Sequence, residues 1–299
     1  EVTVVEVLDG YSAQKQGVRI GDILIVAGGT EISADNVDDI SNYVKGEPGT
    51  EVELKVIRND SRDTLTFNLI REEVLIKNIT YYGFYPPESN NVYMKLSNFS
   101  RSAGDEVKKA LKDLKSQKEI KSIVLDLRGN PGGLLDVAVD ICNKFLAKDK
   151  LIVSTKGREI ASEKKYMSIQ EPMSADSKLI LLINEGSASA SEIVAGAMQD
   201  QDRGVILGVK SFGKGLVQRP IDLTYGTQLK VTISRYYTPS GRCIQALDYS
   251  HKDKNGMATK TEAKNYTAFK TRKGRTVYDG GGIQPDIELE ETKTSPIAN

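Results

Sequence analysis

The sequence has few of the side chains from which metal centres and many catalytic sites are built. Its 299 residues include one His, His251, and two Cys, Cys142 and Cys243. One His and two separated Cys make neither a disulfide framework nor a zinc site, so we expect no metal and no cofactor. His251 stands in a strongly polar stretch, where we expect a solvated side chain. A Ser-His-Asp triad is therefore disfavoured.

The sequence also lacks a surplus of charge and a long apolar run. Lys plus Arg number 41 and Asp plus Glu number 41, so we expect no strong field for nucleic acid or an anionic membrane. No apolar run approaches the roughly 18 residues of a membrane-spanning helix, and no signal peptide is recognisable. The chain begins at Glu1 inside an expected strand. We therefore expect a trimmed piece of a longer protein, with any targeting segment removed.

Residues 1–72 form the first compositional unit, in which short strands alternate with two short helices. This pattern is typical of a PDZ domain, which binds a peptide C-terminus by strand addition. The loop that holds the peptide carboxylate normally precedes the first strand and is not part of this sequence. A small structural domain is the alternative. We expect strands over 2–8, 18–27, 51–58 and 65–70, and helices over 12–16 and 37–44.

From residue 73 onward strands and helices alternate, which predicts an α/β domain with a largely parallel sheet. The apolar runs 123–127 and 179–183 are each followed by a turn rich in small residues and then by a helix. Two such units place two helix N-termini at one edge of the sheet, where sites form in open α/β folds. We also expect strands over 91–99 and 227–234, helices over 103–118 and 136–146, a turn over 235–242, and a polar surface insertion over 248–276. In that insertion the lysines, Arg272 and Arg275 are expected to be solvated rather than bound to an acidic partner.

A serine-rich turn, Asn184-Glu-Gly-Ser-Ala-Ser189-Ala-Ser-Glu192, opens the second of these helices. A serine at this position can be an ordinary N-cap, or a nucleophile whose developing negative charge the helix N-terminus stabilises. A nucleophilic serine needs a base. With His251 disfavoured, the alternative is a desolvated lysine whose neutral amine can take a proton. Lys214 is the candidate, because it lies between two glycines in an apolar neighbourhood.

These motifs resemble those of the carboxy-terminal processing peptidases, also called tail-specific proteases. The resemblance rests on the serine-rich turn and on Gly213-Lys214-Gly-x-x-Gln218, and it extends over most of the chain. Further matching segments are Asp126-Leu-Arg-x-Asn-Pro-Gly-Gly133, Tyr237-Thr-Pro-Ser-Gly-Arg242 and Gly281-Gly-Ile-x-Pro-Asp286, with PDZ-like segments over 12–24 and 45–50.

The resemblance implies a role for each matching residue. Ser189 would be the nucleophile, Lys214 the general base, and Gln218 the residue that orients the lysine. A backbone amide of Gly132 or Gly133, together with that of Ala190, would form the oxyanion hole. Glu192 and Asp200 are weaker candidates for support.

The resemblance also implies an architecture and a function. We expect a PDZ domain over 1–72 and a crotonase/ClpP-like catalytic domain over 73–299. The function would be serine endopeptidase activity on the C-terminal tails of proteins, outside the cytoplasm, with no nucleic acid partner and possible homo-oligomers.

Three other functions have partial support in the sequence. Gly208-x-x-x-x-Gly213-Lys214 approaches a P-loop, but Gly215 stands where Ser or Thr should bind Mg²⁺. An α/β-hydrolase esterase would need Gly-x-Ser-x-Gly, whereas residue 191 is Ser. A peptide-binding PDZ scaffold with a resting or inactive core stays open.

Overall fold

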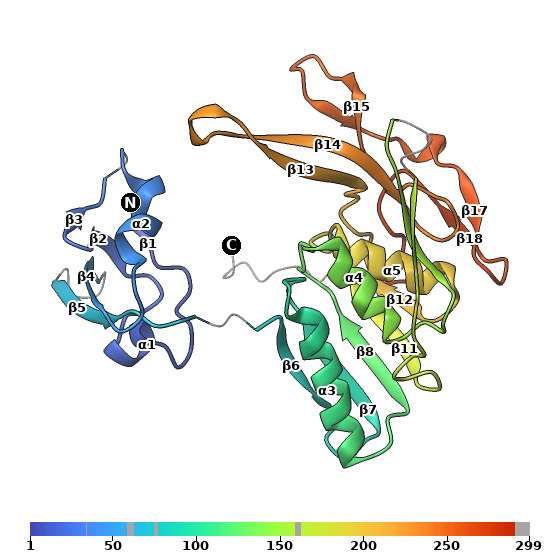
Figure 1. Ribbon diagram of the computed structural model, residues 1–299, viewed down its shortest axis with the longest axis horizontal. Coiled ribbons are helices and arrows are strands. Elements are labelled where there is room, and N and C mark those ends of the chain that lie inside the picture. The colour runs from blue at the N-terminus through green and yellow to red at the C-terminus, as the bar shows by residue number, and fades with distance from the viewer. Residues whose placement is uncertain (34, 59–62, 75–76, 159–162, 291–299) are drawn as a thin grey trace. The chain divides into compact units, whose positions relative to one another are not determined.

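The computed structural model describes residues 1–33, 35–58, 63–74, 77–158 and 163–290 (Figure 1). The chain forms two compact units, residues 1–76 and 77–299. Each unit has its own sheet and its own hydrophobic core.

Unit 1 is a small antiparallel sheet with short helices (Figure 1). The strand order is β1-β2-β4-β5, with β3 paired to β2. The core is small, with Val18, Val52 and Leu69 at its centre. The elements are β1 Val2–Thr3, α1 Ser12–Gln16, β2 Ile23–Ala27, β3 Thr30–Glu31, a 3₁₀ turn Val37–Asp39, α2 Ile40–Val44, β4 Glu51–Ile57 and β5 Thr64–Ile70.

Three predicted elements of unit 1 are shorter in the structure than the sequence suggested. The strand expected over 2–8 pairs with β2 only at Val2–Thr3. The strand expected over 18–27 begins at Ile23, because a turn intervenes in which the buried Asp22 accepts a hydrogen bond from Arg19 N–H and pairs with Arg58. The helix expected over 37–44 is a 3₁₀ turn followed by a short α-helix.

Unit 2 is built on a six-stranded sheet with the order β19-β12-β11-β8-β7-β6. All neighbouring strands are parallel except β6 and β7. The predicted α/β core with a largely parallel sheet is therefore confirmed. The strands are β6 Ile79–Phe84, β7 Asn91–Leu96, β8 Ser122–Asp126, β11 Lys178–Ile183, β12 Val205–Gly208 and β19 Ile287–Glu288.

Three helices and a second, antiparallel sheet complete the core of unit 2 (Figure 1). Helix α5 contacts β12 of the first sheet and β9 of the second, so it lies between the two sheets. Every residue of α5 is buried. The helices are α3 Ala103–Gln117, α4 Leu135–Asn143 and α5 Ala190–Asp200, and the second sheet has the order β10-β9-β14-β13, with β9 Leu151–Lys156, β10 Lys164–Met167, β13 Leu216–Asp222 and β14 Gln228–Tyr237.

The segment 248–276 is more ordered than the sequence suggested. It contributes to two hairpins, whose short, largely exposed strands give no clear alternation of polar and apolar residues. Arg275 is not free for an outside partner, because its guanidinium pairs with Asp202 and Asp286. The elements are a 3₁₀ turn Thr224–Gly226 before this segment, then β15 Leu247–Lys252, β16 Ala258–Lys260, a 3₁₀ turn Ala263–Asn265, β17 Ala268–Lys270 and β18 Thr276–Tyr278.

Candidate active site

Two turns meet at one edge of the parallel sheet. Strands β8 and β11 are hydrogen-bonded neighbours, so the turns that follow them lie side by side. Hydrogen bonds join these turns: Asn130 C=O accepts from Ala188 N–H at 3.0 Å and from Ser191 Oγ at 2.9 Å, and Asn184 Oδ1 accepts from Gly129 N–H at 2.7 Å. The expected meeting of two helix N-termini is present.

Ser189 is the residue immediately before helix α5. Its backbone has φ 54° and ψ −111°, a region that side chains rarely occupy and that costs about 1–3 kcal/mol. The surrounding structure holds it there: Ser189 N–H donates to the Glu192 carboxylate at 2.8 Å, and α5 is buried. Its side chain lines a cavity instead of packing into the core. Backbone strain at a serine whose side chain lines a cavity is an observation that points to function.

The other turn contains the glycine pair Gly132 and Gly133, of which Gly132 packs directly against Ser189. Gly132 has φ 97°, and a Cβ there would lie 2.5 Å from Ala188 O and 2.7 Å from Ala190 N, so only glycine fits. Gly132 N–H is already used, because it donates to Asn130 Oδ1 at 2.9 Å. In the part of the chain that the structure describes, no hydrogen bond uses the N–H of Gly133 or of Ala190. These two amides therefore have no acceptor in the described structure, and Gly133 lines the cavity whereas Ala190 is buried beside it.

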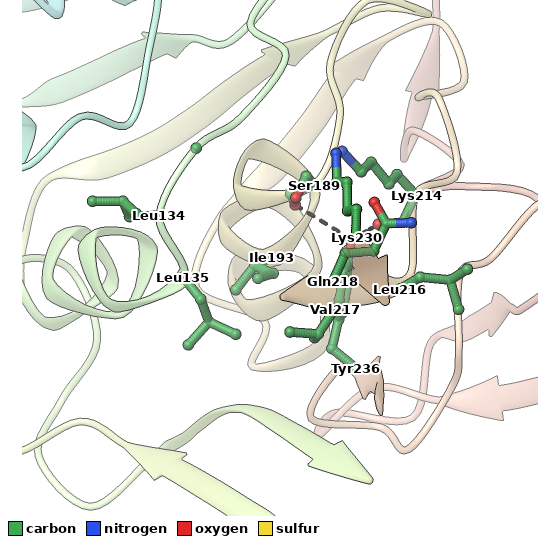
Figure 2. Close-up of a pocket in the computed structure, with 11 residues that line it drawn as sticks. Leu134, Leu135, Ser189, Ile193, Lys214, Leu216, Val217, Gln218, Lys230 and Tyr236 are labelled. Atoms are coloured by element: carbon green, nitrogen blue, oxygen red, sulfur yellow. Dashed lines mark hydrogen bonds between the residues drawn. The ribbon is translucent and has the colours of Figure 1, made fainter. Parts of the chain in front are cut away.

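Lys214 lies in the loop that leads into β13. The loop is fixed at Phe212, whose N–H donates to Ser187 C=O at 3.1 Å. The Lys214 side chain is half-buried and reaches the same cavity as Ser189 (Figure 2).

Glu192 joins the serine and the lysine segments. Its fully buried carboxylate accepts hydrogen bonds from four donors on two segments. The donors are Ser189 N–H at 2.8 Å, Lys214 N–H at 2.9 Å, Gly213 N–H at 2.7 Å and Ser211 Oγ at 2.6 Å. Burial raises the pKa of Glu192, and these hydrogen bonds oppose that rise. The carboxylate thus fixes the backbone of Lys214 relative to that of Ser189.

Tyr236 forms a second link between the same segments. Its hydroxyl donates to the carbonyl oxygen of Lys214 and lies 3.3 Å from that of Ser189 (Figure 2). The ring is buried, and burial raises the pKa of Tyr236 well above its usual range. The hydroxyl therefore stays a donor.

These residues line one cavity of about 330 Å³ (Figure 2). Its polar lining is Ser189, Lys214, Gln218, Lys230 and Tyr236. Leu134, Leu135 and Ile193 provide apolar wall. The cavity thus combines two hydroxyls, one amide, two amines and an apolar surface.

Gln218 reaches the cavity from a strand. It lies on β13, where the pairing with β14 shifts register between Val217 and Gln218. Such irregularities often re-aim side chains near active sites. In the described structure no hydrogen bond joins Gln218 to Lys214.

The structure therefore brings together Ser189, Lys214, Gln218 and Gly133, with Ala190 adjacent and Glu192 behind them. Asp200 is elsewhere, because it ends α5 and pairs with Arg242 at 2.9 Å. Sequence reasoning missed Tyr236, Ser211 and Lys230. Tyr236 falls beside the matching segment that begins at Tyr237, whereas no feature of the sequence alone marked Lys230.

The described residues contain no group of three or more His, Cys, Asp and Glu side chains that could hold a metal ion. None of the helices in the described ranges combines the length and the apolar composition needed to cross a membrane.

A strained serine at a helix N-terminus, two free amides beside it and a lysine on the same cavity are features of serine hydrolases in α/β cores. Comparison with known proteins agrees with this class. The model of peptidase family S41 matches residues 90–251, more than half of the chain, and a PDZ domain model matches residues 3–58. The chain belongs to peptidase family S41, and the resemblance expected from the sequence is confirmed.

Relatives with assigned names give the same result. The chain is 37% identical over 249 residues to a carboxy-terminal-processing protease of Bartonella bacilliformis, covering 82% of this chain and 56% of the relative. It is 30% identical over 261 residues to a chloroplastic C-terminal processing peptidase of Tetradesmus obliquus, covering 84% and 56%. The chain therefore spans about half the length of the curated relatives that it matches.

A solved structure of a photosystem II D1 C-terminal processing protease is also similar. It is 27% identical, with a TM-score of 0.53, and the match covers 96% of this chain and 68% of that one.

Proposed function

We propose that this chain is a serine endopeptidase that acts on the C-terminal tails of proteins, with Ser189 as nucleophile and Lys214 as general base. The observation that carries the proposal is the Glu192 carboxylate, which accepts hydrogen bonds from the backbone N–H groups of both Ser189 and Lys214. A group that holds both segments beside one cavity suits a two-residue catalytic unit.

In this mechanism the neutral amine of Lys214 takes the proton of Ser189 Oγ, and Oγ attacks the scissile carbonyl. The oxyanion accepts hydrogen bonds from the N–H groups of Gly133 and Ala190, which have no other partner in the described structure. Gly132 is disfavoured for this role because its N–H already binds Asn130. Lys214 then gives its proton to the leaving amine. A water, deprotonated by Lys214, hydrolyses the acyl-enzyme.

Gln218 has a supporting role in the proposal. Its side chain lines the cavity together with the Lys214 side chain, and its amide oxygen can accept a hydrogen bond from the lysine amine. We expect this bond to orient the amine when substrate fills the cavity.

The experiment is cleavage of an unfolded protein with an apolar C-terminal tail. We expect Ser189→Ala to abolish cleavage. Lys214→Arg should abolish it too, because a guanidinium keeps its charge but cannot act as a base. Lys210→Ala, which removes a nearby lysine that contacts Tyr266 outside the cavity, is the matched control and should cleave normally. Cleavage by Lys214→Arg at the wild-type rate would break the mechanism.

The pH profile gives a second test. Because only the neutral lysine can take the proton, we expect kcat/KM to rise with pH as the base deprotonates. A profile that is flat from about pH 6 to about pH 10 would contradict a lysine base.

A resting state that the PDZ unit releases is the second candidate. It is favoured by one observation: among the described residues no hydrogen bond joins Ser189 Oγ to Lys214 Nζ. A tail bound by the PDZ unit could shift the population to an assembled site. An uncleavable tail peptide added in trans should then accelerate cleavage of a tail-less substrate. An unchanged rate would reject this gating.

We also infer a location outside the cytoplasm and possible homo-oligomers, both from the family alone. Cell fractionation tests the first inference, and light scattering on the purified chain tests the second.

A further inference from the structure

The β13–β14 ribbon brings a second lysine to the cavity. In the ribbon Gln218 pairs with Thr232, and Pro220 pairs with Lys230. Directly opposed residues share a face, and faces alternate along a strand. Gln218 and Lys230 therefore lie on one face, and both line the cavity with Ser189 (Figure 2). Arg219, one position from Gln218, lies on the other face and does not line it.

The charge of Lys230 is not neutralised within the protein. In the ranges that the structure describes, no carboxylate lies within 4.0 Å of its amine and no hydrogen bond uses it. Lys144, by contrast, pairs with Asp140 at 2.8 Å. The cavity lining contains two lysines and neither Asp nor Glu. A cavity of this kind attracts a ligand that brings negative charge.

The wall on which Lys230 lies faces one part of the substrate. In the proposed mechanism Lys214 gives its proton to the leaving amine, so it stands on the side of the substrate that departs. The ribbon that carries Lys230 begins two residues after Lys214 and borders the same cavity. In the proposed mechanism Lys230 would therefore face residues that follow the scissile bond.

We propose that Lys230 binds a carboxylate in the part of the substrate that follows the scissile bond. This carboxylate is either the α-carboxylate of a chain end or the side chain of Asp or Glu. The proposal rests on the proposed peptidase function and adds a preference to it: a short acidic or free-ended tail is cleaved better than a neutral one.

The test uses one cleaved peptide in three versions. The first ends two residues beyond the scissile bond with a free carboxylate, the second ends there with a carboxamide, and the third is the carboxamide with Asp in place of Asn. We expect the wild-type chain to favour a charged version by about three- to tenfold in kcat/KM. The version that is favoured identifies the source of the carboxylate. Higher salt should reduce the preference.

Three variants separate binding by Lys230 from other effects. In Lys230→Gln we expect the preference for a charged version to vanish, so that the charged peptides are cleaved no faster than the carboxamide peptide. Lys230→Arg should keep most of the preference. Arg219→Gln removes the same charge from the opposite face of the same ribbon, and it should behave as the wild type.

Two results would overturn the proposal. One is equal cleavage of all three versions by the wild-type chain. The other is an equal loss on all versions in Lys230→Gln with a shifted pH profile, which would mean that Lys230 acts through Lys214. In either case the peptidase function stays valid if the wild-type chain cleaves the carboxamide peptide and Ser189→Ala does not. If nothing is cleaved, fluorescence anisotropy of the same peptides on Ser189→Ala still decides whether the charged version binds more tightly.

Discussion

The two ends of helix α5 each bury a carboxylate, but they use it in different ways. At the N-terminal end Glu192 accepts three backbone N–H groups and one hydroxyl, and no cation takes part. At the C-terminal end Asp200 accepts from the buried guanidinium of Arg242 at 2.9 Å and from Ser240 N–H at 3.0 Å. The Cα atoms of the two acids are about 12 Å apart along the helix.

The two carboxylates have different roles: Glu192 positions the residues of the site, whereas Asp200 anchors a neighbouring segment to the helix and forms what we call the clamp. A carboxylate that collects N–H groups from two segments fixes where those backbones lie, and here they carry Ser189 and Lys214. A carboxylate paired with a guanidinium neutralises a buried charge and fastens one segment to the helix. Further bonds at the same end, from Arg275 to Asp202 and to Gln199 C=O, extend the clamp. Damage at the first end should reduce both catalysis and stability, whereas damage at the second should reduce stability alone.

Glu192→Gln should have the largest effect. The amide can replace one carboxylate oxygen but turns an NH₂ group toward N–H donors, so two donors lose their acceptor. At about 1–3 kcal/mol for each donor, unfolding should become about 2–6 kcal/mol easier. We expect kcat/KM to fall at least about a hundredfold in the protein that remains folded, because both segments shift.

Urea unfolding and peptide cleavage at a temperature where Glu192→Gln is folded measure these losses. Glu185→Gln, an exposed acid in the same turn, is the control and should change neither. A folded Glu192→Gln with wild-type kcat/KM would show that the link has no part in catalysis.

Asp200→Asn is expected to act on stability alone. It leaves the Arg242 guanidinium buried without its charge partner, and breaking a buried pair costs about 3–5 kcal/mol. We expect a lower urea midpoint, with activity that falls only in proportion to the folded fraction. A drop in kcat in fully folded Asp200→Asn would put Asp200 back among the site residues.

Much of the fold could be predicted from the sequence because the buried strands have clear patterns. The runs at 123–127 and 179–183 became neighbouring parallel strands, and the helix expected over 103–118 spans Ala103–Gln117. Strands with few buried side chains were harder to predict. The hairpins after residue 247 have exposed strands on which no apolar alternation is required, so their sequence reads as an irregular loop.

Only the site residues that belong to recognisable motifs could be predicted from the sequence. Motif resemblance named Ser189, Lys214 and Gln218, and the structure places all three on one cavity. It gave Glu192 and Asp200 equal weight, because residue type and helix position do not reveal which donors a buried acid will meet. It missed Lys230, whose place depends on the register of two exposed strands, and register is weakly specified where neither face is buried.

Tyr236→Phe should have a smaller effect at the catalytic end. It removes the hydroxyl that donates to the Lys214 carbonyl and lies 3.3 Å from the Ser189 carbonyl, leaving buried acceptors without a donor. We expect a loss of about 1–3 kcal/mol in stability and about tenfold in kcat/KM. Tyr237→Phe, at the half-exposed neighbour, is the control. Equal effects of the two changes would mean that ring packing, not the hydroxyl, matters.

Arg275→Gln should have the smallest effect, and pH should reveal it. Burial alone would raise the pKa of Asp202, but hydrogen bonds from Arg275, Lys273 N–H and Thr271 outweigh it and lower that pKa. Because the pKa of Asp202 is lower in the folded than in the unfolded chain, its ionised form stabilises the fold at pH values above the unfolded-state pKa, which is near 3.9. This stabilisation is lost as the pH falls through the folded-state pKa.

Near neutral pH the free energy of unfolding of the wild type should therefore exceed that of Arg275→Gln by about 1 kcal/mol. The value is modest because Arg275 is partly exposed. This difference in stability between the wild type and Arg275→Gln should disappear below about pH 4 as Asp202 takes up a proton. Added salt should narrow it as well, since screening weakens exposed ion pairs. The loss caused by Glu192→Gln should not respond to salt, because its partners are three backbone N–H groups and one hydroxyl, none of which carries a net charge. A salt-sensitive loss at Glu192, or a gap at Arg275 that persists in acid, would contradict the division of α5 into a catalytic end and a clamped end.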